Sequence, residues 1–393
     1  MFAGGCCVVL AAVMVGAPPA AQNVPVTEAP APLARLLDAA AAPRMPVDYT
    51  EVFRVLAALS GNERKEAMRK LIGGRNDYMT GIVAGQAMRE GYADMAGLIA
   101  SRAIEMGPGD QAGFLEGVTH RRDLFAEIPR ALLRWWDTTE KTSADAGSRL
   151  SVIGLAAMVL ASMDTESDKP AVLGLAQSAP SSGLTWIAIA RARAMNPAAA
   201  RLARRVYRDE ANETGLRVAA AAALQEDPEA RRFAASQVES FLRRFADRPS
   251  GYVIGPVLRA EPAGTDSRDF GDLLGGLNML SILMVMNDED ASRLTTQYVG
   301  KANELTQMVC ATVAVLRWPK KFLELDQSRF ADGLNEQMLA LLEAHHPEDA
   351  VGIESRTTRE RLERARQQVH TLDARVAGGP FMYLFAYLVA PPK

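Results

Sequence analysis

Two segments of the chain share an eight-residue pattern that opens with Asn-Pro or Asp-Pro and continues with alanine, arginine and alanine at fixed positions. NPAAARLA covers residues 196–203 and DPEARRFA covers residues 227–234, so the two copies lie 31 residues apart. Asn and Asp are favoured at the residue that caps a helix, and proline is favoured at the first helical position. The pattern therefore predicts two helices of the same kind, beginning at Pro197 and Pro228.

An alanine-rich helix is expected between the two copies. GLRVAAAAALQE begins at Gly215 and contains five consecutive alanines, 219–223, while GLTWIAIARARAM begins in the corresponding place at Gly183. Leu216, Ala220 and Ala223 fall on one stripe of such a helix, and side chains this small let neighbouring helices approach closely. Helix pairs that recur in this way stack on one another in solenoids. We therefore expect an all-α fold, a right-handed α-solenoid of stacked antiparallel helix pairs over residues 48–250.

A resemblance to known repeat families supports this expectation. Gly91, Ala96, Ala103 and Pro108 are spaced as the first-helix end, the second-helix alanines and the closing proline of a tetratricopeptide repeat, which residues 78–110 resemble. Residues 183–245 are similar to a HEAT-like repeat. Members of both families are scaffolds, so the resemblance implies binding to other proteins and carries over no catalytic residues.

The N-terminal residues have the character of an export signal. CCVVLAAVMVGA, residues 6–17, is a charge-free apolar segment of twelve residues, whereas a membrane span needs about 20. A short apolar core followed by small residues is typical of a signal peptide. We expect residues 1–21 to be such a signal and residues 22–47 to be a Pro/Ala-rich linker with one short helix near 33–41. The mature protein would then be periplasmic or secreted, without a transmembrane span, and with Cys310 as its one cysteine.

The C-terminal third differs in composition. Residues 251–272 are rich in Gly, Pro and Asp and are expected to be a connecting loop, after which residues 273–393 form a C-terminal helical subdomain. Its apolar segments 273–286, 304–318 and 334–346 are interpreted as buried helices, although the β-branched residues leave a strand open for two of them. A helix is also expected over 359–376, and the terminal segment 381–389 is expected to dock on the core.

The sequence offers little catalytic chemistry. No nucleophile elbow, phosphate loop, zinc-protease motif, paired Cys-x-x-Cys or complete calcium loop is present. His345 and His346 are followed by Glu348 and Asp349, but neighbouring helical residues point about 100° apart, so an imidazole that caps helix carbonyls is favoured over a metal site. The set His120 to Asp123 is interpreted as a surface loop. We expect no catalytic residue, no metal and no cofactor.

One helix carries a basic stripe. Arg201, Arg204, Arg205 and Arg208 lie at positions i, i+3, i+4 and i+7, which share one helix face. They are our candidate binding residues, a docking patch for an acidic protein partner or an anionic polymer, and the alternative is a helix face that is simply solvated. The formal net charge of −3 gives no reason to expect nucleic acid. Two functions stay open: an exported scaffold for protein–protein interactions in the bacterial envelope or periplasm, and an all-α hydrolase or lyase with a site assembled from dispersed His, Arg and carboxylate residues.

Overall fold

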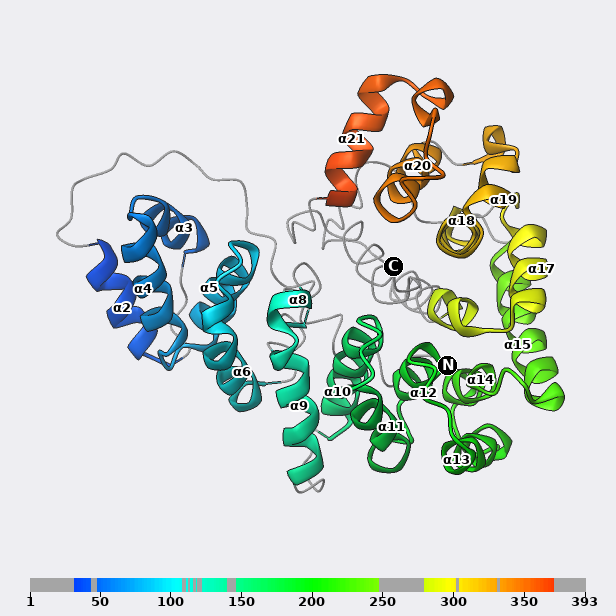
Figure 1. Cartoon of the computed structure of the whole chain (residues 1–393), viewed down its shortest axis with the longest axis horizontal. Helices are drawn as coiled ribbons and strands as arrows, with labels where there is room; N and C mark the ends of the chain where they lie inside the picture. Colours follow the sequence, from blue (N-terminus) through cyan, green and yellow to red (C-terminus); the bar gives the residue numbers. More distant parts are fainter. Residues whose placement is uncertain are drawn as a thin grey trace. The chain divides into compact units, whose positions relative to one another are not determined.

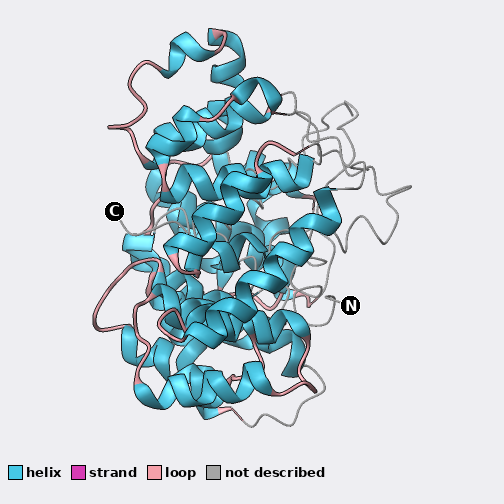
Figure 2. Cartoon of the chain, turned by 90° about the vertical axis from the view of Figure 1, so that its right-hand side faces the viewer, coloured by secondary structure: helices cyan, strands magenta, loops and turns pink. Residues whose placement is uncertain are grey.

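The computed structural model describes residues 32–43, 48–107, 111, 114, 115, 118, 122–139, 146–246, 279–301, 304–330 and 333–370. This part of the chain consists of helices joined by turns and contains no strand (Figure 2). The helices pack in a solenoid-like arrangement, so the all-α expectation is confirmed. Two units divide between Met163 and Asp164, inside the span 48–250 that was expected to form one domain. The expected signal 1–21, the connecting loop 251–272 and the terminal segment 381–389 lie outside the described residues.

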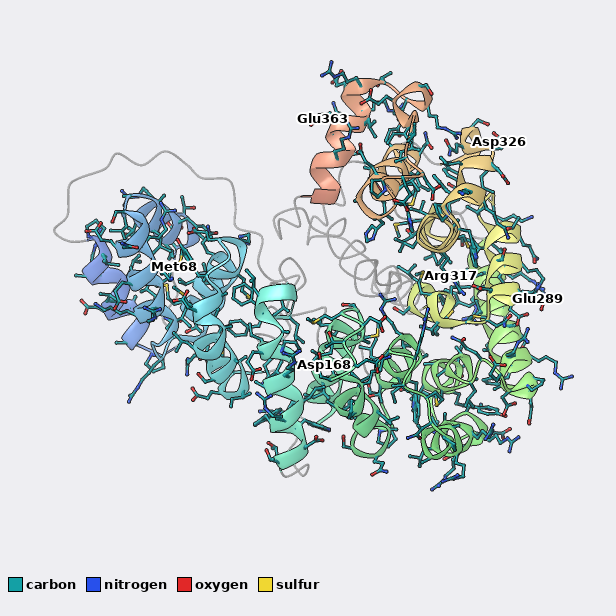
Figure 3. The ribbon with its side chains drawn as sticks, in the orientation of Figure 1. Met68, Asp168, Glu289, Arg317, Asp326 and Glu363 are labelled. Atoms are coloured by element: carbon teal, nitrogen blue, oxygen red, sulfur yellow. The ribbon has the colours of Figure 1, made fainter. Side chains whose placement is uncertain are left out.

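The unit that ends at Met163 is built from short helices that each cover a neighbour. They are α2 (Pro32–Ala41), α3 (Tyr49–Ala57), α4 (Gly61–Ile72), α5 (Asp77–Arg89), η1 (Ala93–Met95), α6 (Ala96–Glu105), α8 (Arg122–Phe125), α9 (Glu127–Thr138) and α10 (Ala146–Ala161). Helix α4 packs against α5, α6 against α9, and α9 against α10 (Figure 1). The buried Met68 lies on the inner face of α4 (Figure 3). The helix pair expected over 78–110 is α5 and α6, with Gly91 between them at a φ of +76°.

Helix α2 is the short helix expected within the linker 22–47, and it packs on α4. The Ala40 carbonyl accepts hydrogen bonds from the backbone N–H groups of Arg75, at 2.7 Å, and Asn76, at 3.0 Å. A Cβ atom on Gly74 would lie 2.5 Å from the Ala40 oxygen, so only glycine allows this approach. Helix α2 therefore belongs to the packed part of this unit, although it precedes Asp48.

The unit that begins at Asp164 continues the pattern of paired helices. It contains α11 (Lys169–Ser178), α12 (Gly183–Arg191), α13 (Pro197–Arg208), α14 (Thr214–Ala223), α15 (Pro228–Ala246), the helical residues 279–285, α17 (Asp288–Tyr298), α18 (Glu304–Arg317), α19 (Pro319–Glu324), η2 (Gln327–Arg329), α20 (Leu334–His345), η3 (Ile353–Arg356) and α21 (Arg359–His370). Helix α12 packs beside α14, and α11 beside α13, so two rows form. The helices follow one another along an arc from α11 to α21, with α13 on its outer side (Figure 1).

Both repeated helices begin as their sequence predicts. Helix α13 starts at Pro197, and the Asn196 side chain accepts a hydrogen bond from the Ala199 N–H at 2.8 Å. Helix α15 starts at Pro228, and Asp227 Oδ1 accepts from the N–H groups of Glu229, at 3.1 Å, and Ala230, at 3.2 Å. Each polar side chain satisfies amide groups that have no partner within the helix.

The alanine run is buried on every side. Residues 219–223 all belong to the core, and their helix α14 contacts α12, α13 and α15. The Cβ position of Gly183, at the start of α12, would lie 3.5 Å from the Ala219 Cβ. The five small side chains therefore form the surface where three helices meet, as the stacking argument predicts.

The apolar segments of the C-terminal third are helices where they are described. Residues 279–285, α18 and α20 supply buried side chains, which removes the alternative of strands there. Cys310 in α18 is a free and fully buried thiol, and burial raises its pKa far above the usual range. Since the thiolate is the reactive form, this cysteine acts as a small apolar residue.

Candidate functional site

Helix α13 has one buried face and one charged face. Ala199, Ala203 and Tyr207 are buried against the neighbouring helices. The four arginines of the predicted stripe lie on the opposite side, and Arg201, Arg205 and Arg208 are exposed. The packing of the apolar face fixes the direction in which the charged face points. The structure therefore brings the four predicted binding residues onto one surface.

Two of the four arginines are tied to the first turn of α15. Arg204 Nε donates to Asp227 Oδ2 at 2.7 Å, with the Asp227 side chain only 14% exposed. This hydrogen bond, more than any other contact, holds the pKa of the Asp227 carboxyl below its usual value. Arg208 pairs with Glu229 and also donates to the Tyr207 hydroxyl at 3.2 Å. Arg204 and Arg208 therefore connect two successive repeats.

The other two arginines have no such role. Arg201 and Arg205 are exposed, and neither side chain forms an ion pair or hydrogen bond with any described residue. Their guanidinium groups keep all five donors for solvent or for a ligand. The sequence could not distinguish these two residues from Arg204 and Arg208, since all four share the same helix face. The free part of the stripe is therefore the pair Arg201 and Arg205.

A cavity of about 660 Å³ lies beside α13, where three turns of this unit meet. The turns follow α12, α14 and the helical residues 279–285, and Arg193, Glu226 and Asn287 are among the lining residues. Arg204 reaches this cavity from α13, so its pair with Asp227 forms part of the wall. The cavity and the free arginines are thus neighbours on α13.

Hydrogen bonds connect the turns around the cavity. Gln225 Nε2 donates to the Val285 carbonyl at 2.6 Å, and Arg231 forms an ion pair with Asp290 at 3.2 Å. Arg317, labelled in Figure 3, donates to the carbonyls of Leu283 and Met286 and pairs with Asp288. Arg231 and Arg317 are therefore each neutralised by a carboxylate. We call these contacts, together with the Arg204–Asp227 pair, the turn network.

Arg193 has an unusual backbone conformation. It follows the last residues of α12 with a φ of +49°, a region that L-residues other than Asn and Asp rarely adopt. Its N–H bonds to the Ala190 carbonyl at 3.1 Å, and the next N–H bonds to Ile189 at 3.0 Å, as at a glycine-ended helix. Sequence reasoning missed this position because arginine gives no signal for a left-handed turn.

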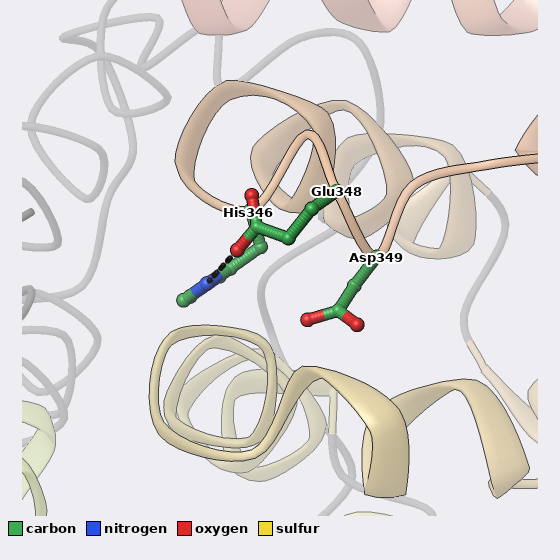
Figure 4. A group of neighbouring side chains, drawn as sticks. All are labelled: His346, Glu348 and Asp349. Carbon is green, nitrogen blue, oxygen red and sulfur yellow. Dashed lines mark ion pairs between the residues drawn. The ribbon is translucent and has the colours of Figure 1, made fainter.

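One group of side chains has the composition of a metal site. His346, Glu348 and Asp349 place one ligand atom each within 4.8 Å of one another, in the turn after α20 (Figure 4). His345 is not a member of this group, because it is the last residue of α20 and His346 already departs from helical geometry with a φ of −134°. That the adjacent histidines share no metal stays a prediction. His120 and Arg121 lie outside the described residues.

Comparison with known proteins adds no relative. No family model, no curated protein and no solved structure matches the chain. The tetratricopeptide and HEAT-like resemblance therefore stays a prediction. Among the described helices, none combines the length and the apolar character that a membrane crossing requires.

Proposed function

We propose that this chain is an exported helical-repeat scaffold that binds an acidic partner protein on the outer face of α13. The observation that carries the proposal is the pair Arg201 and Arg205, which are exposed and have no counter-charge among the described residues. Arginine is enriched in protein interfaces because its planar guanidinium can donate several hydrogen bonds to carboxylates. An acidic segment that crosses α13 would pair with both residues.

The scaffold around these arginines favours binding over a purely solvated face. Helix α13 is fixed by its buried stripe, by its cap at Asn196 and by the two ion pairs to α15. A partner that docks there would order two side chains and no backbone, which keeps the entropic cost of binding small. Residues 6–17 carry the proposal that the protein is exported and works in the periplasm or outside the cell. The alternative of an all-α hydrolase or lyase stays a prediction, and no contact among the described residues favours it.

The proposal is tested with a charge-reversal pair and a matched control. The first variant combines Arg201→Glu with Arg205→Glu. The control combines Arg54→Glu with Arg359→Glu, two exposed arginines elsewhere in the chain that also form no ion pair with any described residue. Both variants change the net charge equally, so a general electrostatic effect would act on both alike.

Binding of a fluorescent poly-glutamate peptide is measured by anisotropy in low and moderate salt. We expect the first variant to lose binding and the control to retain it, with the difference shrinking as salt screens the charges. A photo-crosslinking residue in place of Ala198, which is exposed on the same face, then identifies the partner in the envelope fraction of the host. Equal peptide binding by both variants would contradict the proposal.

A further inference from the structure

The turn after α20 gathers one histidine and two carboxylates around a common point. His346 Nδ1 lies 3.8 Å from Glu348 Oε1, and one ligand atom each of His346, Glu348 and Asp349 lie within 4.8 Å of one another (Figure 4). In a tetrahedral zinc site with bonds of about 2.0–2.1 Å, neighbouring ligand atoms are roughly 3.4 Å apart. Small side-chain rotations of Glu348, which is 70% exposed, and of Asp349 would bring the three atoms to this spacing. We propose that His346, Glu348 and Asp349 bind a divalent transition-metal ion of the Zn²⁺ type.

The surroundings of His346 prepare one ring nitrogen for a metal. His346 Nε2 lies 3.3 Å from the Leu316 carbonyl of α18. A carbonyl only accepts, so this hydrogen bond requires the proton on Nε2 and leaves a lone pair on Nδ1 of the neutral ring, on the side of the carboxylates. Metal-binding histidines usually donate their second ring N–H to a carbonyl or carboxylate in this way. The side chain is only 19% exposed, which holds the ring in this orientation.

The electrostatic environment also favours a cation. Helix α20 ends at His345, and the Leu316 carbonyl near the end of α18 faces the His346 ring, while α19 begins close by at Pro319. The terminal carbonyl groups carry partial negative charge, to which Glu348 and Asp349 add two carboxylates. Lys320 opposes this charge, since its ammonium lies 4.0 Å from Asp349, but it is 84% exposed and can turn into solvent.

The donor set limits the choice of metal. An imidazole with two carboxylates suits Zn²⁺ and neighbouring transition metals, whereas Mg²⁺ and Ca²⁺ prefer oxygen ligands throughout. Three protein ligands would leave one position for water, as in zinc sites that are open to solvent. The site is independent of the free arginines on α13 and does not rest on the function proposed for them.

The test is a titration of the full-length protein with Zn²⁺, followed by calorimetry. We expect one ion per chain, bound at this turn, and a higher melting temperature on binding. Loss of an orienting group alone costs about 10- to 100-fold in metal affinity, so His346→Ala, Glu348→Gln and Asp349→Asn should each weaken binding at least that much. Glu360→Gln, which removes a carboxylate of 84% exposure from α21, should bind like the parent protein.

Two further controls distinguish binding at this turn from binding by cysteine and from loss of the fold. The thiolates of Cys6 and Cys7 are the competing ligands for Zn²⁺. If the ion binds at the turn after α20, replacing both cysteines by serine should leave the Zn²⁺ affinity unchanged. Circular dichroism of each variant without metal should match the parent protein, which excludes unfolding as the cause of a loss. The proposal is wrong if the parent protein binds no Zn²⁺, or if the three turn variants bind it as tightly as the parent does.

Discussion

Helices α13 and α14 are neighbours in the chain and in space, yet they are constrained in different ways. The alanines of α14 contact α12, α13 and α15 and are all buried, so the size of each side chain is limited. Helix α13 buries Ala199, Ala203 and Tyr207 and leaves Arg201 and Arg205 in solvent. The comparison teaches that α14 holds the stacked helices together, whereas packing does not limit which residues occupy the outer face of α13.

The largest expected effect comes from enlarging a side chain within α14. Ala220 is fully buried, so Ala220→Leu should lower the free energy of unfolding by about 1–3 kcal/mol through overpacking. Ala223→Leu should cost less, because Ala223 lines the cavity and leaves space for the added atoms. Chemical unfolding of both variants, with the exposed Ala198→Leu on α13 as the control, measures the difference. An equal loss of stability at all three positions would contradict the view that side-chain size is limited in α14 and not on the outer face of α13.

The second-largest effect on stability is expected at Asp227, which links the two repeats. Asp227 caps α15 and accepts from Arg204, and removal of a cap alone costs about 0.5–2 kcal/mol. We expect Asp227→Ala to destabilise within this range or slightly above it, as measured by chemical unfolding. Glu229→Ala, which removes the exposed partner of Arg208, should change stability by less than about 0.5 kcal/mol.

The Asp227 contribution should also depend on pH. The pKa of its carboxyl is lowered in the folded state, first by the Arg204 hydrogen bond, so the unfolded chain takes up the proton at a higher pH. The stabilisation is therefore complete above the unfolded pKa of about 3.9 and is lost as the pH falls through the lower folded value. Asp227→Asn keeps a capping side chain but loses the charge. The difference in free energy of unfolding between the parent protein and this variant should become smaller from pH 7 to pH 3. A constant difference would exclude a stabilising contribution from the Asp227 charge.

A smaller effect of opposite sign is expected in the turn that leads into α13. Arg193 has a φ of +49°, whereas Gly91 occupies the corresponding place after α5 at +76°. Since a side chain in the left-handed region costs roughly 1–2 kcal/mol, partly offset by the flexibility of glycine when unfolded, Arg193→Gly should stabilise by about 0.5–1 kcal/mol. Arg193→Ala keeps the Cβ atom and should bring no gain. A gain in both variants would show that the arginine charge, and not the backbone, is the unfavourable feature.

The smallest expected effect lies on the outer face itself. Arg201→Ala and Arg205→Ala remove side chains with no partner among the described residues, so each should change the free energy of unfolding by less than about 0.5 kcal/mol. Thermal unfolding provides the measurement. A larger loss would mean that these arginines help to hold α13, and the face would then be structural in the same sense as α14.

The predictable part of the structure is the part encoded within a few residues. Asn196 and Pro197 act on the helix that directly follows them, and the alanines of α14 fall on one helix whatever surrounds it. The starts of α13 and α15 could therefore be read from local pattern, whereas the β-branched residues of α18 left a strand open. The two helix starts need no knowledge of the neighbouring helix.

The remaining features depend on residues far apart in the chain. Arg204 and Asp227 are 23 positions apart, and their pairing is set by how α13 and α15 dock. The approach of Ala40 to Gly74 likewise comes from tertiary packing. His346, and not His345, lies beside Glu348 and Asp349 because α20 ends at His345. If the helix ended one residue earlier or later, the other histidine could take this place. Helix ends are among the features that sequence patterns locate least well.

The turn network has a mechanical consequence. Arg204 joins α13 to the start of α15, and Arg231 joins α15 to α17, so partly exposed ion pairs connect alternate helices along one edge of this unit. The second connection is the packing of the buried alanines of α14 against α12, α13 and α15. Added salt weakens the first connection and leaves the second almost untouched. Rising ionic strength should therefore loosen the links from α13 to α15 and from α15 to α17 before it affects the packing of α14.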